Sequence, residues 1–344
     1  MNLPAGTETP RRILYINVSR IGDTLLVTPA VRAVATAFPQ AEITLLGHPK
    51  RAEILHNLPF VARVGTISKQ RAPWFGRVGG KQFDLAFVCG YDAAIVKYAL
   101  RVARKVIAFR QPDSALNARL FRAVEHPSFQ TEHAVRIQLR LPASAGIAPA
   151  GMNLAYRVSD EEAGWARSEL SRSLPATASP LIGLQVASFP TKAYRDWPID
   201  HFIKLTDRIR ATWPHVHFLI FGGGEEKART ATLAGHLGKA ATRYAGRLTL
   251  RQTAALMNEL DLYIGVDTGP THIMGALHRP MVALYHGYSP SRVLAPLDHP
   301  CAYIVDHPLA DLDATPETPM ADIPVEQVWR SVAQALAEHP PRSR

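Results

Sequence analysis

The sequence is poor in cysteine and contains no long apolar run. Among its 344 residues there are 2 cysteines, Cys89 and Cys301, far apart in the chain. This excludes a disulfide framework and a zinc site built from cysteine thiolates, and it fits a reducing compartment. No stretch approaches the roughly 18 apolar residues of a membrane-spanning helix. Met1 to Pro10 also lack the apolar segment of a secretory signal. We therefore expect a cytoplasmic protein that meets membranes only at their surface.

Several motifs of other enzyme and cofactor classes are also absent. There is no phosphate-binding Walker A loop, no nucleophile elbow and no His-x-x-His spacing for a metal ion. One acidic pair, Asp311-Leu-Asp313, lies in the Pro- and Asp-rich stretch 306–324, which is typical of a solvated connection. We therefore expect neither a metal site nor a cofactor.

Positive charge is concentrated in the first half of the chain. The formal net charge is +10, from 39 Lys+Arg and 29 Asp+Glu. Residues 1–150 contain 20 and 9 of these, a net charge of +11, whereas residues 151–344 contain 19 and 20, a net charge of −1. The first half therefore predicts an anionic partner. Apolar residues make up 47% of the chain, which excludes wholesale disorder and allows a large core.

Short apolar segments alternate with segments of helical periodicity along the chain. The predicted strands are 13–18, 42–47, 84–89, 106–109, 181–186, 217–221, 262–266 and 281–285. The predicted helices are 28–38, 92–103, 200–212, 271–277 and 325–338. This alternation predicts an α/β protein with parallel sheets. The length suggests about two domains, and the Pro- and Ala-rich stretch 142–151 suggests the boundary. We expect ligands at the carboxyl ends of the strands, in a cleft between two similar halves.

The first polar motif, Ser19-Arg-Ile-Gly-Asp23, directly follows the first predicted strand. Gly22 permits a tight turn there. The carboxylate of Asp23 would project above the end of the strand, where it could act as a general base. The alternative is that Asp23 caps the following helix, and one residue could serve both roles.

Two further motifs follow strands of the second half. The first, segment 188–195, contains Ser188, Lys192 and Arg195, whose hydroxyl and cationic groups suit phosphate oxygens. The alternative is a solvated loop without a ligand. The second is Phe221-Gly-Gly-Gly224, in which the backbone amides of Gly223 and Gly224 could approach a phosphate or a nucleotide. The glycines do not complete a G-x-G-x-x-G motif, and such turns are also common without a ligand.

The fourth motif is Gly265-Val-Asp-Thr-Gly-Pro-Thr-His272. Asp267 and Thr268 stand at the tip of a strand, Gly269 turns the chain, and a helix begins near Pro270. Free amides at the helix start, with the Thr268 hydroxyl, form a candidate diphosphate site. His272 lies in the first turn of that helix, where it faces the ligand or serves as a structural histidine.

Together these segments resemble glycosyltransferase family 9, the lipopolysaccharide heptosyltransferases. The resemblance extends from about residue 12 to residue 290, and the motif ending in His272 is its most specific part. It is carried by Ile13–Val18 with Gly22-Asp23, by 28–33, and towards the C-terminus by 245–250, 261–273 and 280–284.

The resemblance implies a GT-B fold of two Rossmann-like domains whose parallel sheets face a central cleft. Residues 1–155 would bind the acceptor, 156–324 the nucleotide sugar, and the helix in 325–344 would return to the first domain. It implies that Asp23 is the catalytic base. The donor diphosphate would be held by Asp267, Thr268, Gly269 and His272 and by a cation before Trp197-Pro198. Whether that cation is Lys192 or Arg195 stays open.

The expected reaction is therefore an inverting, metal-independent transfer of heptose from ADP-heptose to the anionic inner core of lipopolysaccharide, at the cytoplasmic face of the inner membrane. Further donor contacts are expected at Ser188, Gly223, Gly224 and Pro270. The expected acceptor contacts are Arg20, Gly22, Arg101, Arg104, Lys105, Arg110, Arg119 and Arg122.

Other functions remain possible on the sequence alone. Within the family, the donor could be another nucleotide sugar, and the acceptor a capsule chain, an O-antigen chain or a protein. A non-enzymatic nucleotide-binding protein is a more remote alternative. A dehydrogenase would require G-x-G-x-x-G after the first strand, which is missing. No nucleic-acid-binding signature accompanies the basic first half, so no nucleic-acid partner is expected.

Overall fold

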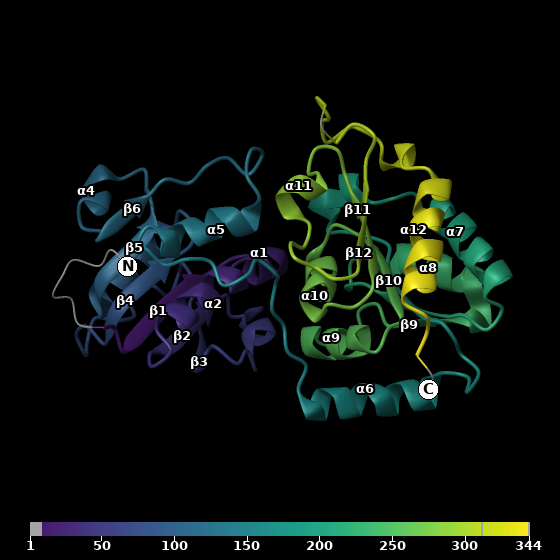
Figure 1. Ribbon diagram of the computed structural model, residues 1–344, viewed down its shortest axis with the longest axis horizontal. Helices are drawn as coiled ribbons and strands as arrows, with labels where there is room; N and C mark the ends of the chain where they lie inside the picture. Colours follow the sequence, from purple (N-terminus) through teal and green to yellow (C-terminus); the bar gives the residue numbers. More distant parts are fainter. Residues whose placement is uncertain (1–8, 311, 343–344) are drawn as a thin grey trace. The chain divides into compact units, whose positions relative to one another are not determined.

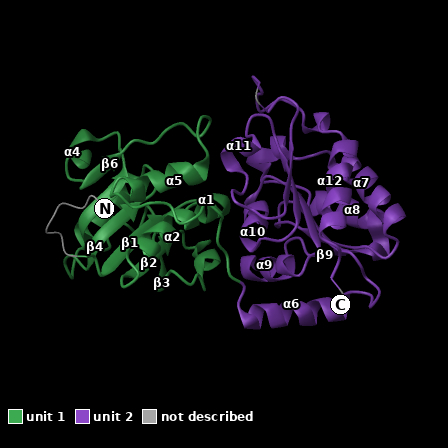
Figure 2. Cartoon of the chain, viewed as in Figure 1, with its two compact units in different colours: residues 1–157 green, residues 158–344 purple. Residues whose placement is uncertain are grey.

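The computed structural model describes residues 9–310 and 312–342 (Figure 1). The chain divides into two compact units, unit 1 with residues 1–157 and unit 2 with residues 158–344 (Figure 2). The boundary predicted from the sequence follows residue 155.

Unit 1 is built on a six-stranded parallel sheet with the strand order β3-β2-β1-β4-β5-β6. Its strands are β1 (Arg12–Asn17), β2 (Glu42–Gly47), β3 (Arg63–Thr66), β4 (Phe83–Val88), β5 (Ala103–Phe109) and β6 (Arg122–Val124). Its helices are α1 (Ile21–Leu26), α2 (Thr28–Ala37), α3 (Ala93–Val102), α4 (Ser114–Asn117) and α5 (Ala134–Ala143).

Unit 2 repeats the pattern with a second parallel sheet, ordered β12-β11-β10-β7-β8-β9. Its strands are β7 (Leu181–Gln185), β8 (His217–Phe221), β9 (Ala241–Arg243), β10 (Leu262–Val266), β11 (Met281–Tyr285) and β12 (Ala302–Asp306). Its helices are α6 (Asp160–Ser173), α7 (Ile199–Thr212), α8 (Lys227–Leu237), α9 (Leu250–Asn258), α10 (Gly269–Leu277), α11 (Ser291–Leu294) and α12 (Val325–Glu338).

When the strands of each sheet are numbered from the first strand of that unit, both sheets have the order 3-2-1-4-5-6. This order is typical of doubly wound α/β proteins. The predicted α/β class is therefore confirmed. In such a sheet the connections reverse direction at one point, which here falls between β1 and β4 in unit 1 and between β7 and β10 in unit 2. Ligands bind beyond the carboxyl ends of the strands at these points.

Apolar strands and the apolar faces of amphipathic helices make up the two cores. In unit 1, Leu14 and Ile16 of β1 are buried against α3. In unit 2, Ile264 of β10 belongs to a cluster that also contains Trp197 and Phe202. Because the central strands are covered on both faces, nearly every side chain in them is apolar.

Helix α12 differs from its expected place. Its buried residues Val328, Val332, Ala335 and Leu336 belong to the core of unit 2, and it packs on α7, β11 and β12. The C-terminal helix is therefore an element of unit 2 and not of the N-terminal domain, because its whole apolar face is used there.

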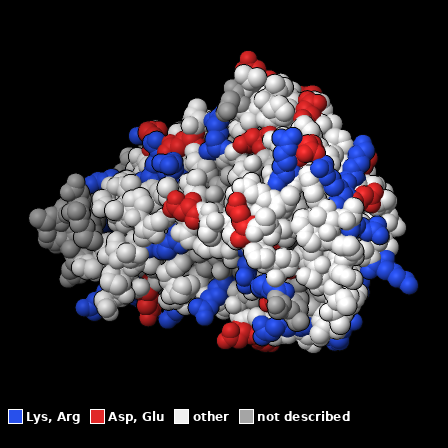
Figure 3. Space-filling view, turned by 45° about the vertical axis from the view of Figure 1, so that its right-hand side comes forward, with Lys and Arg blue, Asp and Glu red and all other residues white. Residues whose placement is uncertain are grey.

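No helix in the described ranges has the length and apolar composition needed to cross a bilayer. On the face of the molecule shown in Figure 3, basic and acidic side chains are interspersed with uncharged surface.

Candidate functional site

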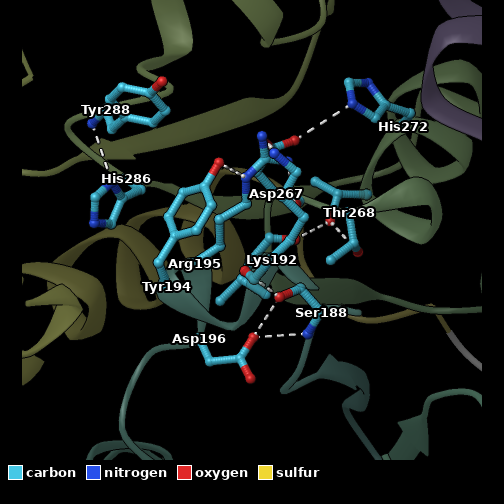
Figure 4. A network of polar contacts seen from close by, with 12 residues as sticks. Ser188, Lys192, Tyr194, Arg195, Asp196, Asp267, Thr268, His272, His286 and Tyr288 are labelled. Carbon is cyan, nitrogen blue, oxygen red and sulfur yellow. Dashed lines mark hydrogen bonds and ion pairs between the residues drawn. The ribbon is translucent and has the colours of Figure 1, made fainter. Parts of the chain in front are cut away.

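In unit 2, two of the predicted motifs meet at the point where the strand order reverses. The loop after β7 contains Ser188, Lys192 and Arg195, and the loop after β10 contains Asp267 and Thr268 (Figure 4). Because β7 and β10 are hydrogen-bonded neighbours, their carboxyl ends lie side by side. The sheet therefore brings together residues that are more than 70 positions apart in the chain.

A buried carboxylate lies at the centre of this site. Asp267 is 1% exposed, and its Oδ2 atom lies 2.8 Å from Nη1 of Arg195. Its Oδ1 atom lies 3.4 Å from Nε2 of His272. Burial acts to raise the pKa of Asp267, but His272 and the positive charges of Arg195 and Lys192 outweigh it and lower that pKa below its usual range. Asp267 is therefore ionised at neutral pH and fixes the Arg195 and His272 side chains.

The loop after β7 is braced by its own hydrogen bonds. Oγ of Ser188 lies 2.7 Å from Oδ1 of Asp196 and 2.7 Å from the backbone carbonyl oxygen of Lys192, and its single hydrogen can be donated to either, while the backbone amide of Ser188 donates to Asp196 at 2.7 Å. Nε of Arg195 donates to the hydroxyl of Tyr194 at 3.2 Å, and Nζ of Lys192 lies 5.5 Å from the centre of the Tyr194 ring. Ser188 thus supports the loop, while both cations lie against one aromatic side chain.

Helix α10 begins directly beside Asp267. Thr268 is its N-cap residue, and its hydroxyl makes no capping bond to the helix. Gly269 and Pro270 form the first turn; Pro270 has no N–H, so the amide donors without a carbonyl partner within the helix are those of Gly269 and Thr271. These amides and the Thr268 hydroxyl can bind an anion, and Arg195 offsets the nearby charge of Asp267.

The glycine-rich loop after β8 has a partner that the sequence analysis overlooked. The backbone amide of Gly223 donates to the carboxylate of Glu226. Burial raises the pKa of Glu226, although the hydrogen bond from Gly223 opposes this shift. Gly224 is exposed, with no atom within 4 Å of the position a Cβ would take. A carboxylate at this turn disfavours phosphate and suits hydroxyl groups.

A cavity of about 430 Å³ opens in unit 1 beyond the carboxyl ends of β1, β2 and β3. Asp23 lies on its wall in the first turn of α1 and is exposed. The N-cap residue of α1 is Arg20, and it makes no side-chain capping bond. Asp23 therefore does not cap the helix. The residues that line the cavity are Val18, Ser19, Arg20, Asp23, His48, Arg51, Ser68, Lys69 and Gln70.

His48 and Arg51 were not predicted from the sequence, and Lys69 was expected only as part of the loop 68–81, which is one of the loops expected to determine acceptor specificity. Arg51 donates to the carbonyl of Ser19 at 3.0 Å. Lys69 forms an ion pair with Asp92 at 3.1 Å. Partial burial, followed by the neighbouring Arg51 and Lys50, lowers the pKa of His48 from its usual value. The positive charge around Asp23 thus comes from Arg20, Arg51 and Lys69.

The other predicted acceptor contacts lie elsewhere. Arg104 is at the start of β5 and pairs with Asp84 at 3.8 Å. Arg101, at the end of α3, donates to the carbonyls of Ala72 and Phe75. In a parallel sheet the start of β5 is at the edge opposite the end of β1, so Arg104 does not lie at the edge that carries Asp23. Gly22 lies in α1 next to Asp23.

Of the other predicted basic residues of unit 1, three have local partners. Arg122 and Lys105 flank the ring of Phe121, at 4.5 and 4.9 Å from its centre. Arg110 pairs with Glu125, and Arg119 is exposed after α4. These four residues do not line the cavity around Asp23.

Within the described ranges, no group of three or more His, Cys, Asp or Glu side chains is arranged to hold a metal ion. Asp311, the first member of the acidic pair singled out in the sequence, lies outside those ranges.

Comparison with known proteins gives a consistent set of relatives. A model of glycosyltransferase family 9 (heptosyltransferase) matches residues 75–310. The chain is 22% identical to the lipopolysaccharide core heptosyltransferase OpsX of Haemophilus influenzae, with 84% of this chain and 83% of that protein covered. It is 28% identical to lipopolysaccharide heptosyltransferase 1 of Pseudomonas aeruginosa, with 85% of each covered.

Solved structures share the fold. A glycosyl transferase family 9 protein from Veillonella parvula superimposes with a TM-score of 0.82, at 20% identity, covering 95% of this chain and 98% of that chain. The ADP-heptose lps heptosyltransferase II of E. coli gives a TM-score of 0.76 at 19% identity, covering 95% and 99%.

Proposed function

Since the chain belongs to glycosyltransferase family 9 and has the GT-B fold, we propose that it transfers heptose from ADP-heptose to the anionic inner core of lipopolysaccharide, with inversion and without a metal ion. Its curated relatives include lipopolysaccharide heptosyltransferases, and E. coli heptosyltransferase WaaC has been solved with ADP and with ADP-2-deoxy-2-fluoro heptose. The observation that carries the proposal is a cationic site for a diphosphate in unit 2 and a basic cavity with one exposed carboxylate in unit 1.

We assign the donor to unit 2. Lys192, the Thr268 hydroxyl and the amides that begin α10 would bind the diphosphate, and Asp267 would keep Arg195 and His272 in place beside it. Negative charge grows on the diphosphate as it leaves, so these groups stabilise the transition state. Because the protein's own cations do this, the transfer is proposed to be unaffected by EDTA.

The neighbouring loop would bind the uncharged part of the donor. Glu226 is half-buried beside Gly223 at the end of β8. Its carboxylate can accept hydrogen bonds from hydroxyl groups such as those of a ribose. It therefore favours a nucleotide over a bare diphosphate.

We assign the acceptor and the base to unit 1. Asp23 removes the proton from the acceptor hydroxyl while that oxygen bonds to the anomeric carbon of heptose. The bond from this carbon to the diphosphate oxygen breaks, and its electron pair leaves with ADP. One displacement of this kind inverts the anomeric centre. Arg20, Arg51 and Lys69 would hold carboxylate or phosphate groups of the acceptor.

The test replaces Asp23 with Asn. This variant keeps the shape of the side chain but cannot accept a proton, so transfer should fall by about 10²–10⁴-fold. Product is read by mass spectrometry with ADP-heptose and deacylated inner core, and ADP binding is measured by calorimetry. An unchanged Kd for ADP shows that the donor site of unit 2 is intact, and an unchanged circular dichroism melting curve separates a lost base from a lost fold of unit 1.

Near-normal turnover of this variant would overturn the role of Asp23. The same assay, run with other nucleotide sugars and with capsule, O-antigen and protein acceptors, tests the substrates. Product from one of those combinations and none from ADP-heptose would replace the proposed reaction with another of the same family.

A further inference from the structure

The connection from β3 to β4 displays apolar side chains to solvent. In its segment 71–81, here called the Trp74 loop, Trp74 is 73% exposed, Phe75 48% and Val78 89%. We propose that the Trp74 loop docks on the surface of an anionic phospholipid bilayer. The proposal deepens the proposed function, on which it rests, because a lipopolysaccharide core acceptor is anchored in a bilayer.

The loop is attached to the rest of unit 1 by several contacts. Ala72 is fully buried in the core beside α3. Arg101 donates to the carbonyls of Ala72 and Phe75, which explains its position away from the cavity. At Gly76 φ is +68°, and a Cβ there would lie 2.4 Å from Cγ1 of Val102. The fold thus presses the loop onto α3 while three large apolar side chains remain outside.

Basic side chains surround these apolar residues. Lys69, Arg71, Arg77 and Lys81 are exposed. No Asp or Glu occurs in the sequence between Glu53 and Asp84. Arg77 also lies over the Trp74 ring, at 5.2 Å from its centre.

This chemistry favours a bilayer over a second copy of the chain. Trp and Phe concentrate at the interface between lipid and water, and Lys and Arg are attracted by anionic headgroups. Two copies of the loop would instead place like charges against each other, which disfavours their association.

The connection also links the docking surface to the site. Ser68, Lys69 and Gln70, directly before the Trp74 loop, line the cavity that contains Asp23. Docking would therefore bring unit 1, which contains the acceptor cavity, to the bilayer in which a lipid-linked acceptor is anchored, and so raise the local concentration of that acceptor.

Vesicle binding tests the inference without relying on catalysis. The full chain is mixed with phosphatidylcholine vesicles, with and without phosphatidylglycerol, at physiological ionic strength and sedimented. Binding is expected only with phosphatidylglycerol. Brominated lipid should quench tryptophan emission of the wild type, and the Trp74→Phe variant should lose most of that quenching while it stays bound.

Variants of the loop then locate the contact. The combined variant Trp74→Ser, Phe75→Ser and Val78→Ser should bind at least about tenfold more weakly, because it loses most of the apolar area of the patch. Arg71→Gln should weaken binding about fivefold. Two variants of unit 2 are matched controls and should leave vesicle binding unchanged. Leu312→Ser removes an apolar residue that is 67% exposed, and Lys239→Gln removes an exposed positive charge. Circular dichroism melting checks that each variant is folded.

Activity measurements separate this inference from the proposed function. The combined loop variant should transfer heptose normally to a deacylated acceptor and poorly to an acceptor embedded in vesicles. If the wild type binds anionic vesicles through the loop but transfers no heptose, the docking surface stands and the proposed reaction fails.

Three results would overturn the inference. One is a wild-type protein that does not bind anionic vesicles, and another is undiminished binding by the combined variant. The third is a concentration-dependent dimer, seen by light scattering, that the combined variant no longer forms, since a second copy would then cover the loop.

Discussion

At the scale of single residues, two cations that follow β7 have different surroundings. Arg195 is 18% exposed at its side chain, and its guanidinium contacts both the carboxylate and the backbone carbonyl of Asp267. Lys192 lies against the ring of Tyr194, further from Asp267. Arg195 is thus committed to a structural pair, whereas the Lys192 ammonium is better placed to bind the diphosphate directly.

Replacing each cation with Met should separate these roles. Lys192→Met should raise the Kd for ADP by about tenfold or more, because the variant loses a hydrogen bond to a charged group. Its free energy of unfolding should change little. Arg195→Met leaves a buried carboxylate without its main partner, so it should also lower the free energy of unfolding by about 3 kcal/mol. Calorimetry with ADP and urea unfolding measure the two quantities. Equal stability of the two variants would contradict this division.

The sequence predicted some site residues and missed others for a clear reason. Asp267 and His272 belong to one short motif, so their proximity follows from local structure. Arg51 and Lys69 come from separate connections, and only the sheet brings them to Asp23. Conversely, Arg104 was predicted from charge alone, and charge does not indicate which end of a strand a residue occupies.

At the scale of elements, the sequence predicted the inner strands and missed the outer ones. The four strands absent from the prediction, β3, β6, β9 and β12, are the outer strands of the two sheets. Inner strands such as β10 are buried on both faces and form continuous apolar runs. An outer strand such as β9 has the short sequence Ala-Thr-Arg and is only half-buried, so its pairing is set by the neighbouring strand.

The start of α7 gives a prediction at this scale. Trp197 is fully buried, and its Nε1 atom donates to the carbonyl of Ile323 at 2.9 Å, which ties this helix to the segment before α12. Trp197→Phe removes the indole N–H and leaves the carbonyl of Ile323 without this hydrogen bond. The variant should lose about 2 kcal/mol of unfolding free energy, measured by urea denaturation.

The exposed Trp74 provides a matched control for that substitution. Trp74→Phe should change the unfolding free energy by less than about 0.5 kcal/mol, as for most surface substitutions. If the two variants were equally stable, the hydrogen bond between Trp197 and Ile323 would not contribute to stability.

At the scale of the whole molecule, the two units share a topology and differ in charge. Each has its own six-stranded sheet and its own buried cluster. The positive excess of the sequence lies in the first half, with a net charge of +11 for residues 1–150. This is the half that contains the basic cavity around Asp23 and the Trp74 loop. Unit 2 has no such excess, and at its site Arg195 pairs with the buried carboxylate of Asp267.

The position of α12 makes the independence of unit 2 testable. If its apolar face completes the unit 2 core, residues 158–344 contain every buried partner of that helix and every residue assigned to the donor. This fragment should therefore unfold cooperatively and bind ADP with a Kd within about threefold of the full chain, a difference under about 0.7 kcal/mol. Circular dichroism melting and calorimetry measure both.

The fragment 158–324, which lacks α12, is the control and should not fold, because Val328, Val332 and Leu336 would no longer cover the sheet beside α7. If instead the fragment 158–344 melts without cooperativity, α12 depends on unit 1, as the sequence analysis expected.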